Sequence, residues 1–209
     1  MSDPEPAPES GAWIEILDQE RRHDGFLKLD RYTVRQRRFD GSLTPPLRRE
    51  VVVPHRAVAV ICYDPALDCV ALIEQLRLPA MIAGFAPVQT EIVAGLVEPG
   101  ETPEAVAIRE VREETGLDAR RLWPVTHMVT TPGHSTETVH IFCAQVDAAN
   151  AGGNHGVAAE HEDIRVVTMP FDELAQRLED GRIANAFTLV AGLWLRCHRE
   201  AVRARWSAP

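Results

Sequence analysis

Four glutamates in one short segment of the chain could together hold a metal ion. Residues 95–117 read GLVEPGETPEAVAIREVREETGL and include Glu101, Glu110, Glu113 and Glu114. Residues three or four apart are neighbours on a helix, and like charges at that spacing weaken it. Hard divalent ions such as Mg²⁺ prefer oxygen ligands, which converging carboxylates supply. The segment is therefore either a solvated surface paired with arginines or a cage for a divalent cation.

The spacing within the segment favours the cage. Five residues follow Gly95, seven follow Glu101, and the segment ends in REVREETGL. At average residue usage, a chance match to every fixed position is on the order of 10⁻⁹ per start site. The pattern resembles a complete Nudix box, G-x5-E-x7-R-E-U-x-E-E-x-G-U, in which U is an aliphatic residue. This resemblance implies a hydrolase that cleaves a nucleoside diphosphate linked to another moiety, using Mg²⁺ or Mn²⁺.

The resemblance also implies a role for each box residue. Arg109 is expected to orient a box carboxylate, and Glu113 is expected to act in catalysis close to the metal. These roles suit pyrophosphate chemistry, because a cation neutralises the charge that grows as water attacks phosphorus. The expected metal ligands in and beside the box are the carbonyl of Ala94 and the side chains of Glu101, Glu110 and Glu114.

A second resemblance lies downstream of the box. In TTPGHSTE, Pro132 stands fifteen residues after Leu117, as in the S-P-G-x-x-x-E segment of ADP-ribose pyrophosphatases, with Thr131 in place of serine. The stretches GNHGVAAEHEDIRVV and EDGRIANAFTLVAGLWLRCHREAVRARW resemble the catalytic loop and C-terminal helix of the bacterial form. By position, Glu162 is expected to complete the metal coordination and Glu160 to deprotonate the attacking water. The resemblance covers most of the chain.

Several residues outside the box are expected around the ADP-ribose. An arginine presents a planar fork to phosphate oxygens, which favours a phosphate role for Arg77 over a solvated strand end. Phe26 could equally be a core residue or stack on adenine. Glu137 could instead be an exposed loop charge. The full set of expected substrate-binding residues is Phe26, Arg49, Arg77, Gly133 and Glu137.

The activity that the resemblance implies is hydrolysis of the pyrophosphate bond of ADP-ribose to AMP and ribose 5-phosphate. A first alternative substrate is another nucleoside diphosphate sugar, such as a GDP- or UDP-sugar, because related branches share the box. A second alternative is a non-catalytic module that only senses nucleotides. An eroded box would be the usual sign of such a module, and this box is intact. We therefore expect an enzyme.

Local signals predict the helix that carries the glutamates. Thr102 suits an N-cap and Pro103 suits the first helical position, while Gly116 suits the residue that ends a helix. A helix is therefore predicted over residues 103–115. Its predicted core-facing residues are Ala105, Ile108 and Val111.

The remaining pattern predicts an α+β fold. Strands are predicted at residues 56–64, 69–77, 91–95, 124–129, 137–146 and 163–169, and further helices at 171–181 and 186–206. Strands interleaved with helices, several in hairpin-like pairs, indicate a mixed β-sheet sandwiched between helices, which is the expected Nudix fold. Polar and apolar residues also alternate around Asp40 and Gly41, which predicts a small N-terminal antiparallel sheet.

Three parts of the chain are predicted. They are a flexible tail over residues 1–12, an N-terminal β-sheet dimerisation region over 13–54, and a Nudix catalytic domain over 55–209. The resemblance implies a homodimer, and a sheet this small is not expected to be stable alone. Phe26 and Arg49 could then reach the active site of the partner.

Composition restricts the partners and the compartment. The 209-residue chain is 45% hydrophobic and 25% charged, as in ordinary globular proteins. No apolar run has the length of a membrane span and the N-terminus lacks signal-peptide features, so we expect a cytoplasmic protein with no membrane partner. A formal net charge of −9 disfavours nucleic acid as a partner. The four cysteines form no CxxC pair, so buried free thiols are expected.

Overall fold

The computed structural model describes residues 13–157, 159 and 161–207, and the predicted tail over residues 1–12 lies outside them. The chain divides into two compact units. The first contains the described residues up to His55 together with Val129–Glu137, and the second contains the rest. The second unit carries the complete box.

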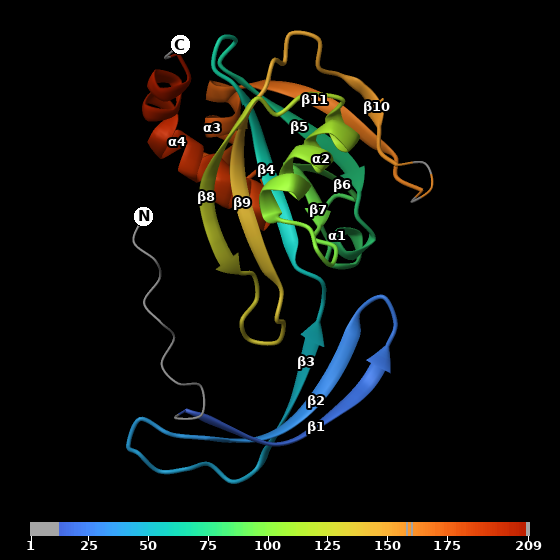
Figure 1. Cartoon of the computed structure of the whole chain (residues 1–209), viewed down its shortest axis with the longest axis vertical. Helices are drawn as coiled ribbons and strands as arrows, with labels where there is room; N and C mark the ends of the chain where they lie inside the picture. Colours follow the sequence, from blue (N-terminus) through green and yellow to red (C-terminus); the bar gives the residue numbers. More distant parts are fainter. Residues whose placement is uncertain (1–12, 158, 160, 208–209) are drawn as a thin grey trace. The chain divides into compact units, whose positions relative to one another are not determined.

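In the described part of the chain, the first unit holds a three-stranded antiparallel sheet (Figure 1). Its strands, in order across the sheet, are β1 (Ile14–Asp24), β2 (Lys28–Gln36) and β3 (Leu47–Val53). Val129–Glu137 joins this unit through β3, since the amide of Val52 donates to the carbonyl of His134 at 2.8 Å. The small N-terminal sheet is thereby confirmed, and β1 is a strand that the sequence did not predict.

The second unit is built on a mixed sheet, which among the described residues has eight strands. Its main path runs β10 (Gly153–His155), β11 (Ile164–Pro170), β5 (Cys69–Leu76), β4 (Ala57–Asp64), β9 (Thr138–Gln145) and β8 (Arg121–Val129). Two short strands lie off this path: β6 (Val88–Glu91) pairs with β5, and β7 (Val93–Leu96) pairs with β4. β4 is parallel to β9 and antiparallel to β5 and β7.

β4 is the central strand of this unit. All of its residues are buried, and its sequence AVAVICYD is apolar up to the final aspartate, as expected for a strand covered on both faces. One edge of β4 pairs along its length with β9. The other edge is divided, because β7 pairs with Ala57 to Val60 and β5 pairs with Cys62 to Asp64.

Helices cover both faces of the mixed sheet. On one face, α3 (Phe171–Glu179) and α4 (Ala186–Ser207) pack with Ile61 and Leu72 in one core cluster. On the other face, α2 (Pro103–Thr115) packs with Val60 and Ile73 in a second cluster. Figure 1 shows α3 and α4 together and α2 apart from them. The predicted sheet between helices is confirmed, with one short additional helix, α1 (Leu78–Ile82), before β6.

The ends of α2 are formed as predicted. The Thr102 hydroxyl accepts a hydrogen bond from the amide of Ala105 at 3.2 Å, and Gly116 ends the helix with φ 69°. The predicted core-facing residues are wrong in part, because Ala105 and Ile108 are exposed while Val111 is buried. The buried face is rotated and includes carboxylates, with these residues buried: Val106, Ala107, Glu110, Val111, Glu114 and Thr115.

A polar cluster joins α4 to the turn between β4 and β5. The Asp68 carboxylate accepts hydrogen bonds from the Tyr63 hydroxyl at 2.6 Å and from Nε of Arg199 at 2.9 Å. Nη1 of Arg203 lies 3.1 Å from the same carboxylate. The Arg199 guanidinium also lies 4.4 Å above the ring of Phe171, which begins α3. These contacts fix both helices against the sheet.

The predicted buried free thiols are confirmed for three of the four cysteines. Cys62, Cys69 and Cys143 are buried free thiols, whereas Cys197 is free and exposed. No helix in the described ranges has both the length and the apolar character needed to cross a membrane.

Candidate active site

Two carboxylates of α2 are buried against the strand that precedes the box. Glu110 is 9% exposed and Glu114 is 2% exposed. The Glu114 side chain accepts a hydrogen bond from the amide of Ala94, on β7, at 3.1 Å. A Cβ atom at Gly95 would lie 1.8 Å from Oε1 of Glu110, so a side chain at that position is incompatible with this carboxylate. The first glycine of the box therefore makes room for one of its glutamates.

Arg109 connects the box carboxylates. Its Nη1 donates to Oε1 of Glu110 at 2.7 Å and to Oε2 of Glu113 at 2.9 Å, and its Nε donates to Oε1 of Glu101 at 3.2 Å. Its Nη2 also reaches the carbonyl of Leu96 at 3.4 Å. Burial disfavours the charged guanidinium, but the surrounding carboxylates outweigh this and raise the pKa of Arg109.

Burial disfavours the ionised forms of the two buried box carboxylates. It raises the pKa of Glu110, and it raises the pKa of Glu114 to about 8. The hydrogen bond from Ala94 and the positive charge of Arg77 lower the pKa of Glu114, whereas the charges of Glu110 and Glu162 raise it further. A cation among these groups would favour their ionised forms.

The donor set fits a hard divalent cation. Its side-chain atoms are carboxylate oxygens, and the Ala94 carbonyl lies on the adjoining strand, which suits Mg²⁺-like ions better than softer metals. Among residues 13–157, 159 and 161–207, no three His, Cys, Asp or Glu side chains already form a metal-binding group. Arg109 pairs with three of these carboxylates, those of Glu101, Glu110 and Glu113.

The loop after β10 brings Glu162 toward these carboxylates. The Glu162 charge raises the pKa values of both Glu110 and Glu114. Its Oε2 accepts a hydrogen bond from the amide of Val157 at 3.0 Å, which closes the loop on itself. The amide of Gly156 donates to the carbonyl of Glu113 at 3.3 Å, so the loop is attached to α2. Glu160 lies outside the described residues.

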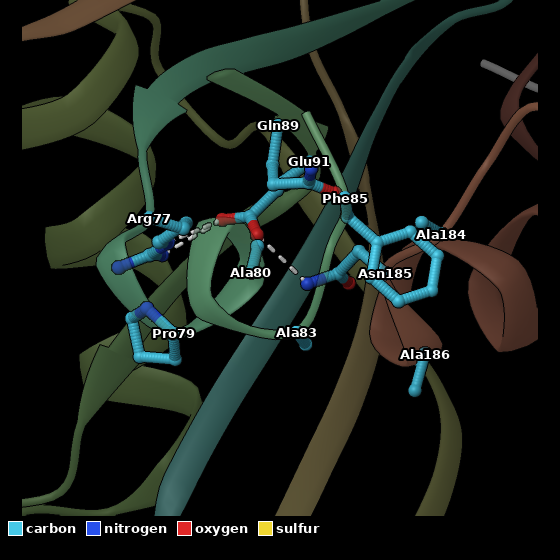
Figure 2. Close-up of a pocket in the computed structure, with 10 residues that line it drawn as sticks. All are labelled: Arg77, Pro79, Ala80, Ala83, Phe85, Gln89, Glu91, Ala184, Asn185 and Ala186. Carbon is cyan, nitrogen blue, oxygen red and sulfur yellow. Dashed lines mark hydrogen bonds and ion pairs between the residues drawn. The ribbon is translucent and has the colours of Figure 1, made fainter. Parts of the chain in front are cut away.

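Arg77 stands at the end of β5, beside a cavity of about 380 Å³ (Figure 2). Its Nε and Nη2 donate to Oε2 of Glu91 at 2.9 and 2.7 Å. The Nδ2 of Asn185 donates to Oε1 of the same carboxylate at 2.9 Å. The cavity is lined by Arg77, Pro79, Ala80, Ala83, Phe85, Gln89, Glu91, Ala184, Asn185 and Ala186.

Glu91 and Asn185 were not singled out from the sequence, although signals for both exist. Asn185 directly precedes the predicted helix that begins at Ala186, and asparagine is a preferred N-cap. Glu91 falls in a predicted strand, where a buried glutamate requires a partner.

The other expected substrate residues belong to the first unit. Phe26 is 77% exposed and its ring centroid lies 6.3 Å from that of His55, so the alternative of a core position is wrong. Arg49 is exposed on β3. Glu137 donates its amide to the hydroxyl of Ser135 at 3.1 Å, in the same loop as Gly133. Their place around the substrate stays a prediction.

The structure combines a mixed sheet between helices with an acidic helix, α2, whose carboxylates are linked by Arg109. This combination is the one expected for a hydrolase with a Nudix box. The sequence model of the NUDIX domain matches residues 53–189, more than half of the chain. The chain therefore belongs to the Nudix family and is a Nudix hydrolase. Enzymes of this family depend in general on divalent metals.

Individual relatives cover nearly the whole chain. It is 39% identical over 194 residues to ADP-ribose pyrophosphatase of Escherichia coli (strain K12), covering 93% of each chain. It is 35% identical over 196 residues to the ADP-ribose pyrophosphatase of Haemophilus influenzae, covering 92% of this chain and 90% of the relative. A GDP-mannose pyrophosphatase of Cronobacter sakazakii is 31% identical over 178 residues, covering 85% and 92%.

A solved structure supports the fold. The crystal structure of an ADP compounds hydrolase aligns with a TM-score of 0.69 and 21% identity, covering 94% of this chain and 100% of that one.

Proposed function

We propose that this Nudix hydrolase cleaves the pyrophosphate bond of ADP-ribose with Mg²⁺, giving AMP and ribose 5-phosphate. Mn²⁺ is the alternative ion. The observation that carries the proposal is the group of buried carboxylates, Glu110 and Glu114, with Arg77 close enough to lower the pKa of Glu114. The relatives named as ADP-ribose pyrophosphatases support this substrate over GDP-mannose, because they are the more similar.

The metal would be held by oxygen atoms of the box and of the loop after β10. When bound, it would neutralise charge on the diphosphate and orient the attacking water. Glu110 and Glu114 are buried, so their carboxylates are held close to β7 before any ligand arrives. The proposed ligands are the carbonyl of Ala94 and the side chains of Glu101, Glu110, Glu114 and Glu162.

Arg109 would orient the box carboxylates. Its guanidinium contacts Glu101, Glu110 and Glu113 together, and its positive charge offsets the repulsion among these three carboxylates. We propose that Glu113 acts close to the metal while its carboxylate is held by Arg109.

Glu160 is proposed to accept the proton of the attacking water. A bound metal would compensate the charge of the box carboxylates and lower their basicity, whereas a carboxylate on a separate loop can approach the water from another side. This assignment is sequence-based, because Glu160 lies outside the described residues.

Five residues are proposed to hold the substrate. Arg77 would bind the diphosphate, and Phe26, Arg49, Gly133 and Glu137 are proposed to contact the rest of ADP-ribose.

We also propose a homodimer built by the N-terminal sheet, because every residue of β1 is exposed in the single chain, including Ile14, Ile16 and Leu17. Apolar side chains on such a strand favour burial against a partner.

Product analysis tests the proposed reaction. Purified protein with ADP-ribose and Mg²⁺ should release AMP and ribose 5-phosphate, and EDTA should prevent it. GDP-mannose and UDP-glucose, tested at the same concentration, should have lower kcat/KM values. A higher value for either sugar nucleotide would move the substrate assignment to that compound while keeping the reaction class.

A further inference from the structure

We propose that Glu91 and Asn185 are positioning residues that fix the guanidinium of Arg77 for contact with the substrate diphosphate. The inference rests on the proposed function, because it takes Arg77 as a phosphate-binding residue. Neither Glu91 nor Asn185 contacts the reacting groups in this proposal. Both act through the orientation of Arg77.

Arg77 and Glu91 form the ion pair drawn in Figure 2. Nε and Nη2 of Arg77 both donate to one oxygen of Glu91, at 2.9 and 2.7 Å. Two donors on one edge of the guanidinium fix the direction of its plane. The pair with Glu91 does not use Nη1, and the arginine side chain remains 40% exposed. Arg77 is thus held from one side and open to a ligand from the other.

The Glu91 carboxylate is held by partners on both of its oxygens. It is only 5% exposed, so both carboxylate oxygens need hydrogen-bond partners. Arg77 donates both hydrogen bonds to Oε2, and Nδ2 of Asn185 donates one hydrogen bond to Oε1 at 2.9 Å. Asn185 therefore prevents rotation of the carboxylate that orients the arginine.

Asn185 is itself held by Thr188. Its Oδ1 accepts hydrogen bonds from the amide of Thr188 at 2.9 Å and from the Thr188 hydroxyl at 3.1 Å. The Thr188 hydroxyl in turn accepts from the amide of Ile92 at 3.0 Å, and Thr188 is fully buried. Because the asparagine oxygen is engaged in this way, its amide nitrogen must face Glu91. The first turn of α4 is thereby linked to β6 and, through Glu91, to Arg77.

A purely structural function of this network is the rival explanation. Asn185 caps α4, and a buried carboxylate needs partners in any protein. However, buried ion pairs are weak contributors to stability, because desolvation offsets their attraction. Here the arginine is partly exposed beside a cavity of about 380 Å³, and its Nη1 takes no part in the pair with Glu91. That placement favours a function in ligand binding.

The variant Asn185→Ser separates capping from positioning. Serine is as good an N-cap as asparagine, so the amide of Thr188 keeps an acceptor. The short side chain loses the donor to Glu91. We expect KM for ADP-ribose to rise about 10-fold, the usual effect of losing one hydrogen bond to a charged group, and the melting temperature to fall because Oε1 of Glu91 loses its partner. Glu91→Gln should raise KM at least as much.

A double-mutant cycle with Arg77→Ala tests whether the effect passes through the arginine. In the Arg77→Ala background, Asn185→Ser should add no further increase in KM. Calorimetric titration with inorganic pyrophosphate and Mg²⁺ provides a second readout and should show the same pattern in Kd. The matched control is Glu173→Gln, because Arg177 binds Glu173 through Nε and Nη2 in the same way on the surface of α3. It should leave KM unchanged.

Three outcomes would overturn the inference. They are an unchanged KM in Asn185→Ser, additive effects of Asn185→Ser and Arg77→Ala, and an unchanged KM and pyrophosphate Kd in Arg77→Ala itself. Failure of the proposed function would look different, because the wild-type protein would then not hydrolyse ADP-ribose. In that case the pyrophosphate titrations alone decide the inference, with Arg77-dependent weakening supporting it and equal affinities overturning it.

Discussion

The imidazole of His155 occupies the space where a side chain on Gly116 would begin. A Cβ atom at Gly116 would lie 2.8 Å from Cε1 of His155, and Gly116 has φ 69°. The last glycine of the box therefore has two functions. It ends α2 in a left-handed conformation, and it lets β10 approach the end of the helix. The loop carrying Glu162 leaves from this contact.

Gly116→Ala should lower both stability and activity. A left-handed conformation costs an L-residue about 1–2 kcal/mol, and displacement of His155 should shift the loop that carries Glu162. Gly181→Ala is a matched control, because Gly181 has φ 67° and open space around a Cβ atom. Urea denaturation should show a loss of stability in both variants, whereas kcat should fall only in Gly116→Ala. Equal kcat values would contradict a function of this contact in the loop.

Glu110→Gln and Glu114→Gln should each lower kcat by roughly two or more decades, because a charged ligand is lost while size is kept. Glu104→Gln serves as the control, since Glu104 lies on the same helix and is exposed. Steady-state kinetics at saturating Mg²⁺ would measure the difference. Full wild-type activity in EDTA would refute the metal assignment.

Glu160→Gln should lower kcat by roughly 10²–10⁴, the usual contribution of a positioned base, with ADP-ribose affinity nearly unchanged. Rates measured from pH 6 to 9 would test this. If the variant kept the wild-type rate throughout, Glu162 and Glu113 would be the next candidates for the base.

Asp68 should make stability depend on pH. Burial disfavours its charged form, but the hydrogen bonds from Arg199 and Tyr63 outweigh burial and lower its pKa. A lowered folded-state pKa gives stability that is present above the unfolded pKa of about 3.9 and is lost as pH falls through the folded value. Asp68→Asn should therefore be less stable than wild type at pH 7, with the difference shrinking below about pH 4.

Urea midpoints of wild type and Asp68→Asn at pH 7 and pH 3 would measure this difference. Asparagine tolerates the positive φ of 54° at this position, so the variant tests the charge rather than the backbone. Asp172→Asn is the control, because Asp172 is highly exposed and its pair with Arg199 is longer, at 3.7 Å. A difference for Asp68→Asn that is the same at both pH values would contradict the assignment.

The protein should be a dimer at micromolar concentration in analytical ultracentrifugation. Ile16→Asp, on the exposed strand β1, should shift it toward monomer, since a charge replaces an apolar side chain at the proposed interface. Leu67→Asp, an exposed apolar position of the second unit, should not. A fully active wild-type monomer would rule out the dimer.

The fold was predictable where local signals and periodicity agree. Thr102, Pro103 and Gly116 define the ends of α2 through backbone chemistry that needs no tertiary context. The buried face of α2 was not predictable from apolar residues alone. Glu110 and Glu114 occupy that face, so the helix is rotated and Ile108 is exposed. Apolar periodicity does not predict the buried face of a helix when charged residues of the site are buried on that face.

One feature that the sequence did not predict is a long-range polar contact. Asn185 and Glu91 are 94 residues apart, and neither forms a motif with Arg77. β1 was missed because every one of its residues is exposed, which leaves no buried face to create an alternating pattern. The box, by contrast, was found because its spacing lies within one continuous segment.

The divided edge of β4 has a consequence for how the box can move. β7 pairs with β4 over four residues, with Ala94 opposite Ala59 at the centre of the unit. Amide protons that are bonded between β4 and β7 exchange with solvent only when the two strands separate, and the amide of Ala94 is bonded instead to the Glu114 side chain. The backbone at Ala94 is therefore held by the sheet, although Glu98 and Gly100 follow it within a few residues in an exposed loop. We therefore expect motion of that loop to be damped at β7, so that Ala94 keeps its place beside Glu114.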